Sequence, residues 1–191
     1  MIRLYIIFIL TYFSSCFRFL YNDINNFGKN EVINIFFISY RKIMVNIFII
    51  QPISMLFLLN YNNINYILIL PEIFFNYFIY DFIHHFIHKK IQESSIHQIR
   101  HNIQLVTFTS TYAHPLDYFL LNVFPVYIGL FLMKAHIITY YYFTIMETYI
   151  LVVTNTKMGN RSRFHLNHKI YMDINYGINM QSDIYFHTYF P

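Results

Sequence analysis

The stretch DFIHHFIHKKIQESSIHQIRHN, residues 81–102, contains five histidines within 22 residues. His84 and His88 are four residues apart, and His97 and His101 repeat this spacing. On a helix, residues four apart lie on one face, one turn from each other, so each pair can direct two imidazoles toward one point. Imidazole is a neutral ligand that suits zinc, copper, iron and nickel alike. The segment therefore predicts a metal site and leaves the metal open.

The composition around this stretch is typical of a membrane protein. Of the 191 residues, 57% are hydrophobic and only 12% are charged, whereas about a quarter of the residues in soluble domains are charged. The net charge of +4 does not indicate a nucleic-acid partner, because the basic residues lie beside apolar segments and form no stripe on a soluble module. The single cysteine, Cys16, rules out an internal disulfide framework.

Four apolar runs approach the length of roughly 20 residues that a helix needs to cross a bilayer. They cover residues 43–60, 64–83, 117–133 and 137–154. A short polar turn separates the members of each pair, so the predicted fold class is an all-α membrane protein with about four transmembrane helices in two hairpins and a cytosolic, histidine-rich helical cap. Pro71 and Glu72 fall inside the second run. Glu72 is either functional or lies at the interface of a tilted helix.

The basic residues divide unevenly between the two ends of these hairpins. Lys134 lies at one end, and nine lysines and arginines lie at the other: Arg41, Lys42, Lys89, Lys90, Arg100, Lys157, Arg161, Arg163 and Lys169. Cytoplasmic ends of membrane helices are enriched in lysine and arginine, so the end with nine charges is predicted to face the cytosol. The histidine pairs lie at this same end.

Residues 1–40 are predicted to lie apart from the membrane domain, which covers residues 41–191. The apolar run of residues 4–20 resembles a signal sequence, but Arg18 disfavours a cleavage site, so an uncleaved anchor or an interfacial helix is expected. Residues 22–31 are expected to form a polar loop.

Further histidines extend the set. His165 and His168 are three residues apart and share a helix face, and His114 lies in the motif HPLD. The three pairs and His114 are therefore candidate metal ligands: His84, His88, His97, His101, His114, His165 and His168. The alternative is that histidines gather at the headgroup level without a metal. That would spread them over both faces, and only His136 lies on the opposite one.

The motifs resemble, in kind and in order, those of the fatty acid hydroxylase and sterol desaturase superfamily. Three segments are similar to its histidine boxes: HHFIH at residues 84–88, HQIRH at 97–101 and HLNHK at 165–169. Three further segments are similar to stretches of its members: YAHPLDY at residues 112–118, which is similar to the YAHPLE of C-4 methylsterol oxidases, NYG at 175–177, and SDIYFHTY at 182–189. HLNH and YDFIH are also similar to motifs of fatty acid hydroxylases.

The resemblance implies a membrane-bound oxidoreductase of lipid biosynthesis with a non-haem di-iron centre. Such an enzyme hydroxylates or desaturates a sterol or fatty acyl lipid with dioxygen. The implied cofactors are two iron ions, with zinc as a substitute, and the implied partners are the lipid substrate, the membrane and a cytochrome b-type electron donor. The histidines would serve as ligands, and the first box adds His85 as an eighth candidate; no other catalytic residue is assigned. The expected location is the endoplasmic reticulum or an equivalent internal membrane, with the histidine boxes facing the cytosol.

Three positions depart from the family pattern. Arg100 and Lys169 stand where paired histidines are expected, and Val152 replaces a histidine expected five residues after Glu147. A guanidinium group cannot bind a metal, and a lysine must first lose its proton. Two interpretations follow: an active lipid-oxidising enzyme, or a catalytically degenerate relative that keeps the fold and binds lipid or one metal. An unrelated small membrane protein would not show these motifs in order.

Carboxylates near the histidines have more than one possible role. Asp117 is either a ligand or a first-turn carboxylate that favours the N-terminus of a helix. Asp81, Asp117 and Asp173 could also hold the outer nitrogens of ligating histidines.

Overall fold

The computed structural model describes residues 1–61, 66–103, 106–154, 167–168, 174–177 and 181–189 of the chain. Within these ranges the regular elements are helices and there is no strand. The α-helices are α1 (Ile2–Phe27), α2 (Lys29–Val45), α3 (Gln51–Leu58), α4 (Ile69–Ile91), α5 (Ser95–His101), α6 (Pro115–Tyr118), α7 (Phe124–Met133), α8 (Ile137–Val153) and α10 (Gln181–Tyr185). Shorter turns of 3₁₀-helix lie at Tyr66–Leu68 and Thr107–Thr111, and π-helical turns at Asn46–Ile50 and Phe119–Val123. The expectation of an all-helical fold is confirmed for the described residues.

Four helical stretches are long and apolar enough to cross a membrane. They are Ile2–Phe27, Lys29–Leu58, Tyr66–Ile91 and Pro115–Met133. The number agrees with the sequence prediction, but the members differ. The N-terminal helix belongs to the set, whereas the predicted span at residues 137–154 is the 17-residue helix α8, shorter than the ~20 residues of a full span.

The polar loop predicted at residues 22–31 is wrong. Helices α1 and α2 occupy this region with only Gly28 between them. Gly28 has a φ of 82°, which glycine reaches without the steric cost that a side chain would add. The polar side chains here do not interrupt α1, since the buried carboxylate of Asp23 accepts a 2.8 Å hydrogen bond from the backbone N–H of Thr107.

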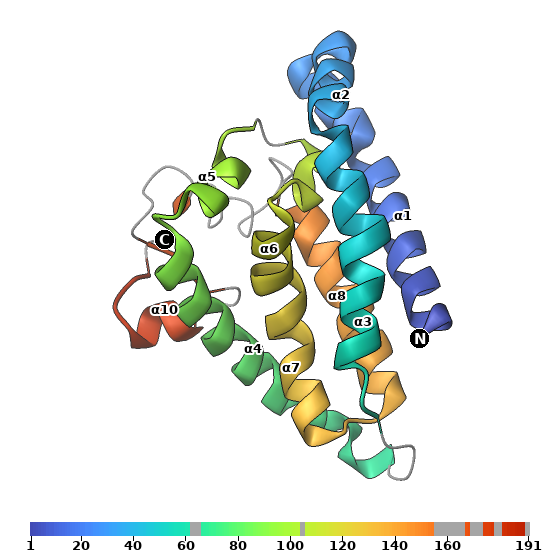
Figure 1. Ribbon diagram of the computed structural model, residues 1–191, viewed down its shortest axis with the longest axis vertical. Coiled ribbons are helices and arrows are strands. Elements are labelled where there is room, and N and C mark those ends of the chain that lie inside the picture. The colour runs from blue at the N-terminus through green and yellow to red at the C-terminus, as the bar shows by residue number, and fades with distance from the viewer. Residues whose placement is uncertain (62–65, 104–105, 155–166, 169–173, 178–180, 190–191) are drawn as a thin grey trace.

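Helix α1 packs along α8 (Figure 1) and is part of the main hydrophobic core. Leu4, Phe8 and Tyr12 are almost fully buried there. The Tyr12 hydroxyl donates a 2.9 Å hydrogen bond to the carbonyl of Phe108. Helix α1 therefore shares its core with later helices, and the boundary predicted at residue 40 stays a prediction.

Polarity is distributed as in a protein that is surrounded by lipid. Large apolar side chains lie on the outer faces, where Ile67, Leu70 and Phe57 are 83%, 77% and 75% exposed. Asn46 and Asn76, in contrast, are completely buried. A bilayer would cover the apolar faces, while the two buried amides donate hydrogen bonds to backbone carbonyls inside the bundle. The arrangement is consistent with an integral membrane protein.

Both π-helical turns end two residues before a proline, Pro52 in the first case and Pro125 in the second. A proline inside a helix lacks the N–H and clashes with the carbonyl four residues earlier. A wider turn moves that carbonyl away, so the helix continues past the proline. Pro71 lies in the first turn of α4, where proline is tolerated.

Glu72 caps the neighbouring helix α8. Its Oε2 accepts hydrogen bonds from the backbone N–H of His136 at 2.9 Å and from the hydroxyl of Thr139 at 2.6 Å. His136 adds a second cap, since its Nδ1 accepts from the N–H of Ile138 at 3.1 Å. These contacts fix the turn after α7, which ends at Lys134 in a left-handed conformation.

Asn46 connects the first π-helical turn to the segment that leads into α6. Its Nδ2 donates to the carbonyls of Thr111 at 2.8 Å and Ala113 at 3.0 Å. The segment is thereby fixed just before α6 begins at Pro115. The buried amide of Asn46 therefore helps to fix the position of α6.

Replacing Asn46 with alanine should destabilise the fold. Asn46→Ala leaves two carbonyls without their donor, and we expect the free energy of unfolding to fall by about 2 kcal/mol. Thermal unfolding in detergent, followed by circular dichroism, measures the change. The exposed Asn30→Ala variant on α2 is the control and should shift the free energy by less than about 0.5 kcal/mol. Equal midpoints for the two variants would contradict the anchoring role.

Candidate metal centre

The two histidine pairs lie on α4 and α5, at one end of the bundle (Figure 1). His84 and His88 are buried on one face of α4. A turn after α4 leads to Ser94, whose Oγ caps α5 by accepting a 3.2 Å hydrogen bond from the N–H of His97. The cap starts the second helix so that His97 is buried against α4.

Three histidines from separate segments converge. His88, His97 and His168 are buried, and each offers a ring nitrogen within 4.8 Å of the other two. The Nε2 atoms of His88 and His97 are 3.1 Å apart, and the Nε2 of His101 is 2.9 Å from that of His97. The ring centre of His168 lies 4.3 Å from that of His88 and 5.5 Å from that of His101. This group could hold a metal ion.

Each of the three converging imidazoles is oriented by an oxygen atom at Nδ1. These oxygens are the carbonyl of Tyr176 at 3.1 Å from His88, Oδ1 of Asp117 at 2.7 Å from His97, and the carbonyl of Ile174 at 2.7 Å from His168. A carbonyl or carboxylate oxygen only accepts, so each Nδ1 carries the proton. Each Nε2 then presents its lone pair to the common point.

This geometry fits a metal ion. Two facing nitrogen lone pairs 3.1 Å apart repel each other unless a cation lies near both. Metal–nitrogen bonds of about 2.0–2.1 Å at tetrahedral angles place the ligand nitrogens roughly 3.3 Å apart, close to the separations of 2.9 and 3.1 Å found here. Oxygens at the outer nitrogen are also the usual partners of ligating histidines. An imidazole set suits several metals, so the geometry selects neither their identity nor their number.

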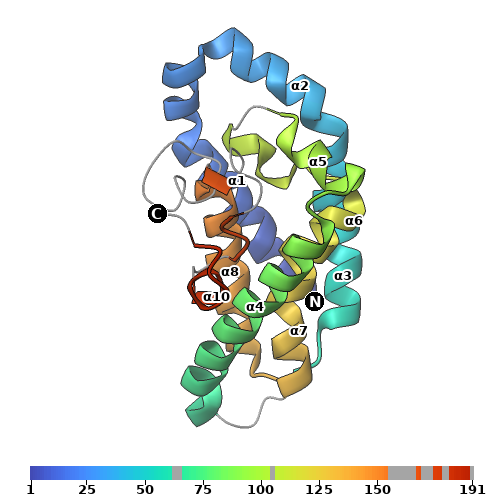
Figure 2. The same ribbon diagram turned by 90° about the vertical axis from the view of Figure 1, so that its left-hand side faces the viewer.

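A buried carboxylate holds the loop that supplies one of these oxygens. Asp183 lies on α10, which packs beside α4 (Figure 2). Its oxygens accept 2.7 Å hydrogen bonds from the N–H groups of Tyr176 and Gly177 and from the hydroxyl of Thr188. A Cβ atom on Gly177 would lie 2.7 Å from Asp183 Oδ2 and 2.8 Å from Asp81 Oδ1. A larger residue than glycine would therefore push the loop away from both carboxylates.

The remaining predicted ligands lie around the converging group. The carbonyl of Tyr176 also accepts from His84 Nδ1 at 2.7 Å, and the His84 ring centre is 5.1 Å from that of His88. His85 lies toward α10, with its Nδ1 3.3 Å from Asp183 Oδ1. That these two bind a metal stays a prediction.

Two other predicted ligands are farther along the chain. His114 caps α6, since its Nδ1 accepts from the N–H of Leu116 at 3.3 Å. His165 lies outside the described residues, as do Lys169 and Asp173. Their predicted roles are untested.

Asp117 performs two of the functions that the sequence suggested for it. It lies in the first turn of α6, and it holds the outer nitrogen of His97. Sequence reasoning missed its other partner, the Nε of Arg100, which is 3.2 Å from Asp117 Oδ2. The available signal was the spacing of His97 and Arg100, because residues three apart on a helix share a face.

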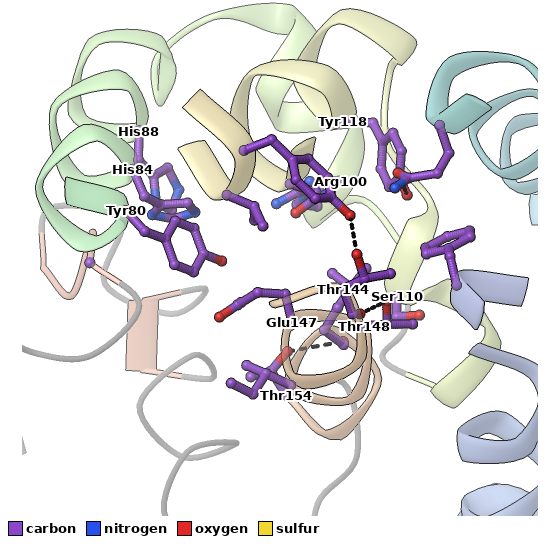
Figure 3. Close-up of a pocket in the computed structure, with 18 of the residues that line it drawn as sticks. Tyr80, His84, His88, Arg100, Ser110, Tyr118, Thr144, Glu147, Thr148 and Thr154 are labelled. Atoms are coloured by element: carbon purple, nitrogen blue, oxygen red, sulfur yellow. Dashed lines mark hydrogen bonds between the residues drawn. The ribbon is translucent and has the colours of Figure 1, made fainter. Parts of the chain in front are cut away.

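A cavity of about 90 Å³ lies against His84 and His88 inside the bundle. Figure 3 shows Tyr80 and these histidines on one side, with Glu147 of α8 opposite. Thr144 is among several hydroxyl-bearing residues that line it. The lining combines imidazole, hydroxyl and carboxylate groups with a larger apolar surface.

The motifs around the histidines can be compared with those of known proteins. No protein-family model, curated protein or solved structure matches the chain. Membership of the fatty acid hydroxylase and sterol desaturase superfamily therefore stays a prediction from the motifs.

Removing the carboxylate of Asp183 should weaken metal binding although no histidine is lost. In Asp183→Ala the Tyr176 carbonyl, which holds the outer nitrogen of His88, is no longer fixed. Loss of such partners of ligating histidines typically changes metal affinity 10–100-fold. Competition for zinc against a chromophoric chelator, in detergent, measures the loss. Glu93→Ala removes an exposed carboxylate between α4 and α5 and should leave the affinity unchanged. An Asp183→Ala protein with wild-type zinc affinity would contradict the role of the loop.

Proposed function

We propose that this chain is a membrane-bound, non-haem iron oxidoreductase that hydroxylates or desaturates a sterol or fatty acyl lipid with dioxygen. The observation that carries the proposal is the convergence of His88, His97 and His168, each held at Nδ1 by an oxygen. Imidazole ligands with such outer contacts suit iron, and zinc as a substitute. Apolar helices of membrane-spanning length adjoin the site, so a lipid could reach it from the bilayer.

The residues that carry the family resemblance have physical roles around the histidines, which supports the proposal. Asp117 of YAHPLDY holds His97. Tyr176 of NYG provides a carbonyl to two histidines, and Asp183 of SDIYFHTY holds that loop in place. Histidines that lay at a membrane interface by chance would not need such contacts.

Bound iron would supply the redox chemistry, in which reduction of dioxygen is coupled to oxidation of a lipid C–H bond. The chain itself would hold the metal through neutral imidazoles and keep bulk water out, since the three histidines are buried. Electrons would come from a cytochrome b-type carrier. Lys89 and Lys90 are exposed at the end of α4 and could attract an acidic surface of that partner.

The resemblance implies two iron ions, and the described residues bring three imidazoles to one point. A second ion would use histidines beside that group. His101 is in contact with His97, and His84 lies against the cavity inside the bundle. We propose that these two histidines, with the predicted ligand His165, complete the centre.

The second candidate function is that of a relative without catalysis, which keeps the fold and binds lipid or one metal. The observation that favours it is Arg100, which stands in place of a family ligand and pairs with Asp117. A single ion at His88, His97 and His168 would then stabilise the junction of α4 with α5.

Metal analysis of the purified protein tests the proposal first. After expression with iron supplied, we expect about two irons per chain, lost in the His88→Ala/His97→Ala variant, because this pair provides two converging ligands. His187→Asn, which replaces an exposed histidine of left-handed backbone conformation, should keep its iron. Elemental analysis gives the numbers. Protein without metal, after growth with iron and zinc, would contradict the oxidoreductase and would leave only the relative that keeps the fold and binds lipid.

Isotopic oxygen separates the two candidates. The iron-containing protein is supplied with a reductant, a mixture of membrane lipids and ¹⁸O₂, and the lipids are analysed by mass spectrometry. A lipid that carries ¹⁸O or has lost two hydrogens supports the oxidoreductase. Bound metal at one ion per chain, with every lipid unchanged, supports the relative without catalysis.

We further propose that the histidine end faces the cytosol from the endoplasmic reticulum or an equivalent internal membrane. Lys89, Lys90 and Arg100 lie at this end, whereas Lys134 lies at the other. Positive charge is enriched on the cytosolic side of membrane proteins. This supports the orientation that the sequence predicts.

Thiol labelling of sealed microsomes tests this orientation. A membrane-impermeant maleimide should label Glu93→Cys without permeabilisation and Lys134→Cys only after it, because these exposed positions lie at opposite ends. The native Cys16 is buried and should remain unlabelled in both variants. Labelling of Lys134→Cys in intact vesicles would reverse the orientation.

A further inference from the structure

We propose that Arg100 is a positioning residue of the metal centre, which acts through Asp117 on His97. The inference rests on the proposed metal binding. It assigns to Arg100 a function other than that of a lost ligand. The contacts form a chain: Arg100 Nε is 3.2 Å from Asp117 Oδ2, and Asp117 Oδ1 is 2.7 Å from His97 Nδ1.

The two oxygens of Asp117 are thereby divided between a cation and an imidazole. The Asp117 side chain is 0% exposed and that of Arg100 is 11% exposed. A buried carboxylate is costly without a partner for its charge. Arg100 supplies this charge at Oδ2 while His97 lies at Oδ1, so the carboxylate stays in the rotation that directs Oδ1 to Nδ1.

The orientation of Asp117 determines where His97 directs its other nitrogen. His97 is the central imidazole of the group, since its Nε2 lies within 3.1 Å of both His88 Nε2 and His101 Nε2. A rotation of its ring would separate it from both neighbours. Arg100 therefore acts through one intermediate, Asp117, on His97, the proposed ligand that links α5 to His88 of α4.

Arginine suits this position better than the histidine of the family pattern. Its guanidinium keeps its charge and binds no metal. Both Arg100 and His97 belong to α5, three residues apart on one face, and Asp117 approaches from α6. One short helix thus presents a ligand together with the cation that fixes that ligand's carboxylate partner.

Cobalt binding to the full-length protein in detergent tests the inference. Cobalt(II) reports both affinity and, through its visible absorption bands, ligand geometry. We expect Arg100→Met to bind cobalt 10–100-fold more weakly, which is the usual effect of losing a contact that holds a ligating histidine. The visible absorption bands of the bound cobalt should also shift. Arg100→Lys, which keeps the charge, should recover part of the affinity. The exposed Arg41→Met is the matched control and should bind as the wild type does.

A double-variant comparison distinguishes positioning from a general effect on folding. If Arg100 acts through Asp117, the double variant Arg100→Met/Asp117→Asn should bind cobalt about as weakly as the weaker-binding single variant. Independent residues would instead give a fold-loss equal to the product of the two single losses. Multiplicative losses would overturn the inference. If Arg100→Met fails to fold, as judged by its unfolding midpoint, Arg100→Lys takes its place in this comparison under the same criterion.

Other outcomes are equally decisive. Wild-type affinity and bands in Arg100→Met would overturn the positioning role while leaving the proposed function intact. A second cobalt ion in Arg100→His would show that the position is a vacant ligand site, which also overturns it. A wild-type protein that binds no cobalt would overturn both this inference and the proposed function.

Discussion

A hydrogen bond at Nδ1 is what directs the Nε2 of each converging imidazole inward. With an oxygen on the outer nitrogen, the proton is fixed there and the Nε2 lone pair points to the shared centre. The three oxygens come from two parts of the chain, the first turn of α6 with Asp117 and the segment that contains Ile174 and Tyr176. Asp183 holds the segment that contains Tyr176, and Arg100 pairs with Asp117.

The same requirement explains why polar groups lie inside a bundle whose outside is apolar. Asn46 fixes the segment before α6, and α1 supports that segment from the other side through Tyr12 and Asp23. Each buried group has a backbone partner, which limits the cost of removing it from water. The position of Asp117 therefore depends on helices that contribute no ligand.

The sequence predicts those parts of the structure that depend on spacing and hydrophobicity. The i, i+4 spacing of His84 with His88 and of His97 with His101 places each pair on one helix face, as observed. The loop at residues 22–31 was wrong because polar composition suggested an interruption, whereas Asp23 is buried by a contact 84 residues away. The contacts at Nδ1 were only partly predictable. Every residue has a backbone carbonyl, so the side-chain pattern does not predict that the carbonyl of Tyr176 in particular accepts a hydrogen bond from a histidine.

The wide sequence separation of the contacts sets an order of assembly. When α4 and α5 have emerged from the ribosome, His88 and His97 are present, but the carbonyl of Tyr176 and the carboxylate of Asp183 are still to be synthesised. Until they arrive, the Nδ1 of His88 lacks the oxygen that holds it in the folded chain. The group of His88, His97 and His168 therefore reaches its folded geometry only after translation has passed α10.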